Sequence, residues 1–232
     1  MLQSEEEVIV IECGISFLDV KKELNFDTTK IKCVLLTHEH KDHSKYLKDY
    51  DMAGIPICSS AGTLEEMKIR NVEGLKSGYW YKYGGFLVTP FKVQHDCVEP
   101  YGFLVRHDDM GTMLFATDSE YIRYDFRKYN IDHICIECNY EKNILDDRIR
   151  KKEIDIGLAN RIKSTHMELE TCKEFIKKNN SPLLKNVVLL HLSDGNSDSR
   201  FFKKEVKKIV ADDVNVFIAD KGLDVTVDKY NF

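Results

Sequence analysis

Short apolar runs alternate with amphipathic stretches along this chain. Runs rich in Val, Ile and Leu predict strands at residues 8–13, 32–37, 86–93, 102–107, 112–117, 133–138, 186–191 and 215–220. Many of these runs are apolar at every position, as expected for strands buried on both faces. Helical spacing predicts helices at residues 16–24, 60–69, 143–163, 167–179 and 199–210. Because strands and helices interleave, we expect a layered α/β domain.

A turn-rich segment, GYWYKYGG at residues 78–85, connects a predicted helix to a predicted strand. Its aromatic side chains can stack on a ligand base, but packing in a partly buried hairpin is the preferred interpretation. The chain contains no internal repeat, low-complexity linker or proline-rich hinge. We therefore expect one domain that spans residues 1–232.

The net charge limits the ways in which this chain can bind a polyanion. The 232 residues carry 34 basic and 39 acidic side chains, a formal charge of −5, so a polyanion must be met by metal ions or local basic patches. No apolar run approaches the roughly 20 residues that cross a bilayer, and the start lacks the basic region of a signal peptide. We expect a cytoplasmic protein that does not bind membranes. Seven cysteines, an odd number, are expected to stay reduced, with Cys135 and Cys138 in the core.

The strand at residues 32–37 runs directly into the sequence HEHKDH, a dense group of metal-binding side chains. Imidazole and carboxylate are ligands for zinc, manganese or iron, and a strand-to-loop transition lets alternate side chains converge. A polar helix start at the surface would explain one or two of these residues but not four behind an apolar strand. The candidate ligands are His38, His40, Asp42 and His43.

Three further candidates follow other predicted strands. His95 lies just after FKVQ, Asp118 after TMLFAT, and His191 after NVVLL. Each alone is usually a residue that caps a turn, but the three together with HEHKDH favour metal ligation. A carboxylate such as Asp118 can bridge two cations.

These motifs resemble those of the metallo-β-lactamase superfamily over nearly the whole chain. QHDCVEPYGF, TDSEY and LLHLSDGNSD are most similar to the YycJ-type (WalJ-like) exonucleases and their phage and Firmicute relatives. The resemblance implies an αββα four-layer sandwich with two divalent metal ions per chain, zinc or manganese first and iron next. It places His38, His40 and His95 on one ion, Asp42, His43 and His191 on the other, and Asp118 between them.

Two such ions imply phosphodiester hydrolysis by a bridging hydroxide, without a serine or cysteine nucleophile. Asp42 belongs to the predicted catalytic set as well as to the metal ligands. The resemblance further implies that His166, expected to open a helix, pairs with Glu137 in the apolar strand ICIEC. We interpret His166 as the proton donor and Glu137 as the group that orients it. The alternative is a helix-capping His166 and a structural ion pair.

The start of the chain departs from the resembling family. Those proteins open with an extra strand before the segment that matches VIVIECG, which begins here at residue 8, so the first strand is expected to be missing. Glu12 stands where relatives carry an Asp that supports the metal ligands. A second subunit that completes the sheet edge, in a homodimer, is one explanation. His107 and His133 are expected to be surface histidines.

Our leading hypothesis is a dinuclear metal-dependent phosphodiesterase that acts on nucleic acid, in particular a DNA exonuclease. A phosphodiesterase for small cyclic nucleotides or cyclic sugar phosphates is the first alternative, and it suits the acidic charge better. A non-catalytic binding protein that retains the fold is an alternative of another class. β-Lactam, thioester or lactone hydrolysis and a di-iron oxygen-reducing activity are weaker alternatives.

Overall fold

The chain forms two compact units in the computed structural model, which describes residues 1–69 and 71–229. Unit 1 comprises residues 1–92 and 97–103, and unit 2 comprises residues 93–96 and 104–232. The chain therefore enters unit 2 briefly at residues 93–96, returns to unit 1, and passes back into unit 2 within one strand.

Unit 1 contains a five-stranded sheet in the order β1-β2-β3-β4-β5. Its strands are β1 (Leu2–Gln3), β2 (Val8–Ile11), β3 (Ile31–Leu35), β4 (Ile57–Ser60) and β5 (Val72–Leu75). β1 pairs antiparallel with β2, and the other neighbours are parallel. The unit also contains β6 (Tyr81–Tyr83), β7 (Phe86–Lys92) and the start of β8 (Tyr101–His107), in the order β8-β7-β6.

The helices of unit 1 follow its strands along the chain. They are α1 (Phe17–Glu23), α2 (Lys41–Ser44), α3 (Leu47–Met52) and α4 (Ala61–Met67), with a short 3-10 turn, η1 (Thr28–Lys30). Ser16 and Ser60 start α1 and α4 because their side chains accept the backbone N–H three residues on. The apolar faces of α1 and α3 meet β2 and β3 in one core cluster, in which Val8, Val34 and Tyr50 are fully buried.

Unit 2 contains a sheet in the order β12-β11-β10-β9-β8. Besides the end of β8, its strands are β9 (Gly111–Ala116), β10 (His133–Glu137), β11 (Asn186–Leu190) and β12 (Asn215–Ile218). The pairs β9–β10, β10–β11 and β11–β12 are all parallel. Parallel strands present their carboxyl ends at one edge of the sheet, which is where α/β proteins build their sites.

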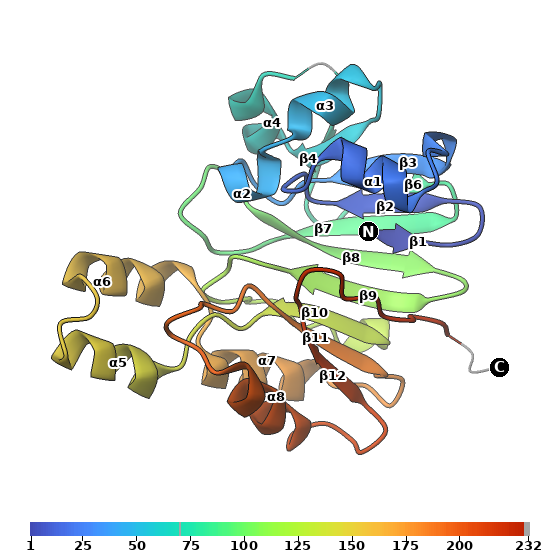
Figure 1. Ribbon diagram of the computed structural model, residues 1–232. Helices are drawn as coiled ribbons and strands as arrows, with labels where there is room; N and C mark the ends of the chain where they lie inside the picture. The colour runs from blue at the N-terminus through green and yellow to red at the C-terminus, as the bar shows by residue number, and fades with distance from the viewer. Residues whose placement is uncertain (70, 230–232) are drawn as a thin grey trace. The chain divides into compact units, whose positions relative to one another are not determined.

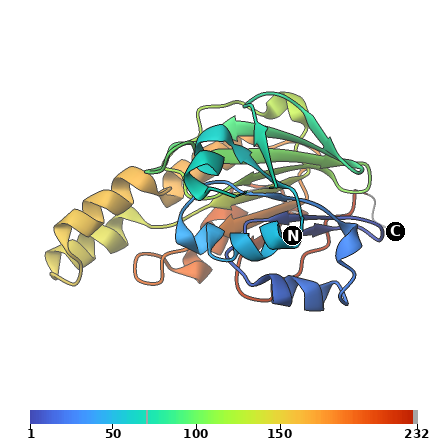
Figure 2. The ribbon, with the colours of Figure 1, turned by 90° about the horizontal axis from the view of Figure 1, so that it is seen from above.

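Four helices and a 3-10 turn complete unit 2: η2 (Arg127–Tyr129), α5 (Lys142–Arg150), α6 (Ile156–Thr165), α7 (Leu169–Asn179) and α8 (Ser199–Lys207). α5 and α6 lie side by side as a helical hairpin that extends away from the sheet of this unit in both views (Figure 1 and Figure 2). Tyr140, Leu145 and Ala159 form the small core of this hairpin. It therefore holds itself together with its own apolar contacts.

The predicted α/β class with two sheets is confirmed, and all eight predicted strands are present. The structure adds β1, β4, β5 and β6, which are short, and α2 and α3, which the sequence pattern did not predict. The charged stretch at residues 143–163, predicted to be helical, forms two helices, α5 and α6, rather than one continuous helix. Lys152 takes a left-handed φ of 58° after α5, and Asp155 accepts the N–H groups of Gly157 and Leu158 to start α6.

None of the helices formed by residues 1–69 and 71–229 is both long enough and apolar enough to cross a membrane.

Candidate metal centre

Three imidazoles of unit 1 converge just beyond β3. The ring of His38 lies 4.7 Å from that of His40 and 4.3 Å from that of His43, between centroids. His38 is buried, and its Nδ1 shares a 2.8 Å hydrogen bond with Thr37 Oγ1, so its Nε2 is the nitrogen that can face an ion. Asp42 Oδ2 lies 3.3 Å from His43 Nε2. The structure therefore brings together the four candidate ligands that belong to unit 1.

Glu12 supports this group from the end of β2. Its carboxylate oxygens are buried and accept no hydrogen bond among the described residues, and Oε1 lies 3.6 Å from Nδ1 of His43. A buried carboxylate without hydrogen-bond donors is costly unless positive charge is close. Glu12 also has a left-handed φ of 70°, an uncommon backbone conformation for a residue other than glycine. Both features suit a residue that orients His43 toward a cation.

The two residues after Glu12 brace the loop that carries Asp42 and His43. The N–H of Cys13 donates to the His43 carbonyl at 2.7 Å, and the N–H of Tyr46 donates to the Cys13 carbonyl at 3.0 Å. Gly14 packs so closely that a Cβ there would overlap the Asp42 carbonyl oxygen. The backbone of the ligand loop is therefore fixed by contacts with a segment about 30 residues earlier.

In unit 2, three candidate residues lie at the carboxyl edge of the parallel sheet. Asp118 lies two residues beyond β9, Glu137 is the last residue of β10, and His191 directly follows β11. The register pairs Glu137 with Leu190, so Glu137 and His191 reach the edge together. Asp118 and His191 have left-handed φ values of 45° and 53°. Strain of this kind persists where the surroundings enforce it, and it is concentrated at functional sites.

Glu137 organises this edge. Its side chain is 0% exposed, and Oε2 accepts the backbone N–H of Ser119 at 2.6 Å and of Met167 at 3.2 Å. Oε1 accepts Nδ1–H of His166 at 2.7 Å and lies 3.2 Å from Nδ1 of His191. These contacts stabilise a buried carboxylate and fix the orientation of His166.

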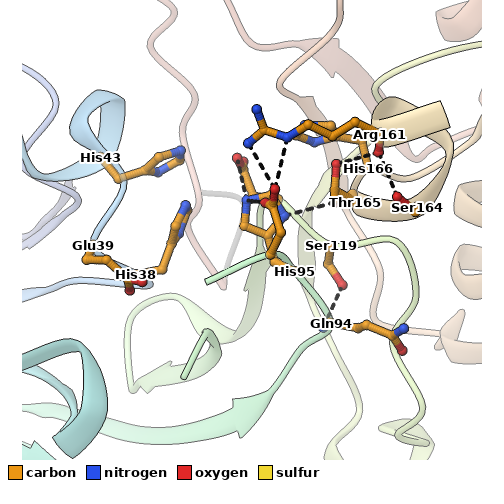
Figure 3. Close-up of polar contacts among 12 residues, drawn as sticks. His38, Glu39, His43, Gln94, His95, Ser119, Arg161, Ser164, Thr165 and His166 are labelled. Carbon is orange, nitrogen blue, oxygen red and sulfur yellow. Dashed lines mark hydrogen bonds and ion pairs between the residues drawn. The ribbon is translucent and has the colours of Figure 1, made fainter. Parts of the chain in front are cut away.

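His95 is oriented by the end of α6. Its Nδ1–H donates to the Thr165 carbonyl at 2.9 Å, and its Nε2 lies 3.7 Å from Asp118 Oδ2 and 3.3 Å from Asp96 Oδ1 (Figure 3). Burial lowers the pKa of His95, against the opposing influence of the Thr165 carbonyl and of Asp118. A neutral imidazole whose other nitrogen is held by a carbonyl is the usual form of a metal-binding histidine.

His191 lies in a strongly negative environment. Burial disfavours its charged form, but hydrogen bonding to Asp118 at 2.8 Å and to Glu137 raises its pKa to about 10. Two buried carboxylates thus lie against the His191 ring, and the same negative charge would favour a bound cation.

The donor set of unit 2 fits divalent ions. Ligand atoms of His95, Asp118 and His166 lie within 4.8 Å of one another, and so do those of Glu137, His166 and His191. Mixed imidazole and carboxylate donors suit zinc, manganese and iron.

Two expectations about histidines are corrected. His166 does not open a helix: it caps the end of α6, and its backbone N–H donates to the Ile162 carbonyl at 3.1 Å. His133 is not a surface histidine, because it is 1% exposed and both ring nitrogens are hydrogen-bonded.

Sequence reasoning missed Asp96 and Arg161. Asp96 directly follows the candidate ligand His95, and that adjacency was the available signal. Arg161 forms an ion pair with Asp96, but nothing in the sequence links two residues 65 positions apart.

The fold and these motifs define a metallohydrolase-type α/β protein. The family model described as "Beta-lactamase superfamily domain" matches residues 7–192, so the chain belongs to that family. The exodeoxyribonuclease WalJ of Streptococcus pneumoniae is 24% identical over 216 residues, which cover 84% of this chain and 77% of that protein.

Solved structures agree with the family assignment. The metallo-β-lactamase fold protein YhfI from Bacillus subtilis has a TM-score of 0.70 at 20% identity, and the match covers 95% of this chain and 88% of YhfI. The short form of human tRNase Z has a TM-score of 0.64 at 16% identity, covering 97% of this chain and 90% of the human chain. These similarities confirm the predicted metallo-β-lactamase fold.

Proposed function

We propose that this chain is a metal-dependent phosphodiesterase that cleaves DNA from an end, as an exonuclease. The proposal rests mainly on one observation: the buried carboxylate of Glu137 accepts the Nδ1–H of His166 beside the cluster of Asp118, His95 and His191. A histidine oriented in this way next to a metal-binding group has the parts of a hydrolytic site.

The roles of the residues follow from their contacts. The side chains that would hold divalent ions are His95, Asp118 and His191 of unit 2 and the predicted ligands His38, His40, Asp42 and His43 of unit 1. Such ions, when bound, activate water and neutralise charge on the phosphoryl group. Because Nδ1–H of His166 donates a hydrogen bond to Glu137, the other nitrogen, Nε2, is the one that donates a proton to the leaving oxygen.

The relatives support a nucleic-acid substrate. WalJ is named an exodeoxyribonuclease, and tRNase Z is named for an RNA substrate. The formal charge of −5 favours a second candidate, a phosphodiesterase of small cyclic nucleotides or cyclic sugar phosphates, because such substrates carry little negative charge.

The test begins with metal analysis of the purified chain and hydrolysis of bis(p-nitrophenyl) phosphate with added zinc or manganese. End-labelled single-stranded DNA, duplex DNA, RNA and a cyclic nucleotide are then compared. We expect about two metals per chain, chelator-sensitive turnover, and stepwise shortening of DNA. Asp118→Asn should abolish turnover, whereas Asp109→Asn, an exposed aspartate of the same unit, should not.

Two other outcomes of these assays would contradict the exonuclease proposal. Preferred turnover of the cyclic nucleotide would replace the nuclease proposal with the second candidate. A folded, metal-loaded chain that hydrolyses none of these phosphodiesters would contradict the enzyme proposal and favour a binding protein that retains the fold.

A further inference from the structure

The last turn of α6 presents several groups to His95. Thr165 accepts the Nδ1–H of His95, and His166 follows directly, with its ring centroid 5.4 Å from that of His95. Arg161 lies four residues before Thr165, on the same face of the helix. Its guanidinium reaches the residue next to His95 (Figure 3).

Asp96 links Arg161 to His95. Its Oδ2 accepts Nε–H of Arg161 at 2.9 Å and lies 2.9 Å from Nη2 of the same side chain. Its other oxygen, Oδ1, lies 3.3 Å from Nε2 of His95, the nitrogen that faces the candidate metal position. The Asp96 carboxylate therefore lies between the guanidinium and Nε2 of His95, and it holds the guanidinium close to the candidate metal ligands.

The Arg161 fork is engaged on one side only. Among the described residues, both polar contacts of its guanidinium fall on a single oxygen of Asp96, and the side chain is 60% exposed. Arg127 uses the same Nε and Nη2 edge, but on both oxygens of its partner: Nε lies 3.0 and 2.9 Å from the two oxygens of Asp125, and Nη2 lies 2.5 Å from Oδ2. A guanidinium has five N–H donors in a fixed plane. Nη1 of Arg161 thus remains directed away from Asp96 and able to donate to another anion.

The charges around Nη1 of Arg161 indicate what kind of group it binds. The surrounding group in unit 2 contains the carboxylates of Asp96, Asp118 and Glu137, which repel an anionic substrate. Arg161, through its ion pair with Asp96, supplies a fixed positive charge beside this group, and arginine matches phosphate oxygens in geometry as well as charge.

We propose that Arg161 donates through Nη1 to a non-bridging oxygen of the substrate's phosphodiester, and that Asp96 positions the guanidinium for this contact. Arg161 is then a specificity-determining residue for anionic phosphodiesters. The inference rests on the proposed function for the identity of the substrate. A strand of nucleic acid and a small cyclic phosphodiester share the chemistry that Arg161 recognises.

The experiment measures binding of a fluorescein-labelled oligothymidylate with phosphorothioate linkages, which keep the negative charge and resist hydrolysis. Fluorescence anisotropy is recorded for the full chain as purified, over a range of salt concentrations. Arg161→Gln should weaken binding about tenfold and lower the slope of log Kd against log salt by about 0.7, the value for one phosphate contact on a single strand. Arg161→Lys should recover only part of the loss, because it restores the charge without the fork.

Two control variants remove the same charge elsewhere in unit 2. Lys163→Gln acts on the same helix, where Lys163 pairs with Asp146 at 2.7 Å. Arg127→Gln breaks the ion pair of Arg127 with Asp125. Both should leave Kd and the salt slope within about twofold of the unmodified chain.

The inference is overturned if Arg161→Gln binds the oligonucleotide as Lys163→Gln does, or if the unmodified chain does not bind it. It is also overturned if Arg161→Gln loses metal while Kd is unchanged, since Arg161 would then only support His95. KM values for oligonucleotide and cyclic nucleotide substrates show which phosphodiester Arg161 serves. A chain that hydrolyses no phosphodiester disproves the proposed function, yet the anisotropy series still decides the role of Arg161.

Discussion

At the scale of single residues, Glu137 and His166 form the contact with the clearest chemical consequence. The Nδ1–H of His166 is committed to a fully buried carboxylate, so the ring has one nitrogen left for proton transfer. A proton donor matters most when the leaving oxygen is strongly basic, as the alkoxide of a DNA strand is, and least for p-nitrophenolate.

We therefore expect His166→Ala to lower kcat on DNA by about 10²- to 10⁴-fold. Its effect on bis(p-nitrophenyl) phosphate should be much smaller, and its metal content should be unchanged. Steady-state kinetics on both substrates, with metal analysis, make the measurement. His107→Ala, which changes a histidine of the same unit outside this site, is the control. Equal losses on both substrates would argue against proton donation.

His133 illustrates a different use of a buried histidine. Its Nε2–H donates to the Met110 carbonyl at 3.1 Å, and its Nδ1 accepts from Nδ2 of Asn186 at 3.0 Å. Burial lowers the pKa of His133, although the Met110 carbonyl acts in the opposite direction. Protonation at Nδ1 would oppose the Asn186 N–H and place a charge in the core.

The lowered pKa of His133 determines the direction in which this residue changes stability with pH. As pH falls, a histidine whose pKa is lowered in the folded chain becomes protonated first in the unfolded chain. Its contribution to the stability of the fold is therefore present above pH 6.5 and is lost as pH falls from there toward its folded pKa. We expect urea denaturation to show less loss of stability between pH 7 and 5 for His133→Gln than for the unmodified chain. Parallel profiles for the two proteins would remove His133 from the acid response.

At the scale of elements, the ligand loop of unit 1 depends on the segment that follows β2. Gly14 leaves room for the Asp42 carbonyl, where any side chain would collide with backbone. Backbone cannot rotate away as a flexible side chain can, so the loop from His40 to Ser44 must shift to admit a Cβ.

Gly14→Ala should therefore cost about 1–3 kcal/mol of stability and lower the metal content of the purified chain. Gly74→Ala is the matched control, because Gly74 lies in β5 with nothing within 4 Å of an added Cβ. Its unfolding temperature and metal content should be unchanged. Thermal unfolding and metal analysis of both variants provide the comparison, and a Gly14→Ala protein with full metal content would show that the loop tolerates the shift.

At the scale of the whole molecule, the sequence predicted the elements that are long and strongly patterned. The eight apolar strands, α1, α4, α7 and α8 follow directly from periodicity. β4, β5 and β6 are three or four residues long, too short for a reliable pattern, and residues 151–155 break a charged helix through backbone conformation and capping rather than through an apolar signal.

The candidate ligands were predictable where they lie close together in the sequence or at the ends of predicted strands. His38, His40, Asp42 and His43 are close in sequence, and Asp118, Glu137 and His191 end strands that the sequence already marks. The contacts that orient these side chains were not predictable. The hydrogen bond from His95 to the Thr165 carbonyl and the ion pair of Arg161 with Asp96 are tertiary contacts between residues about 65 to 70 positions apart. Glu12 was noticed only through the family resemblance, and its burial beside His43 required coordinates.

Metal removal tests the site on the whole chain. Anything that binds the folded state alone stabilises it, by about 2.7 kcal/mol when its concentration is 100 times its Kd. For a chain of this length that corresponds to an unfolding temperature higher by roughly 5–10 °C. Chelation by EDTA should therefore lower the Tm by about that amount, and added zinc or manganese should restore it. EDTA already saturated with zinc is the control and should have no effect. Asp118→Asn should unfold at the same temperature with and without chelator, because the carboxylate predicted to bridge the ions is gone. A Tm that does not respond to EDTA, in a protein shown to have released its metals, would mean that the buried carboxylates and histidines are stable without ions.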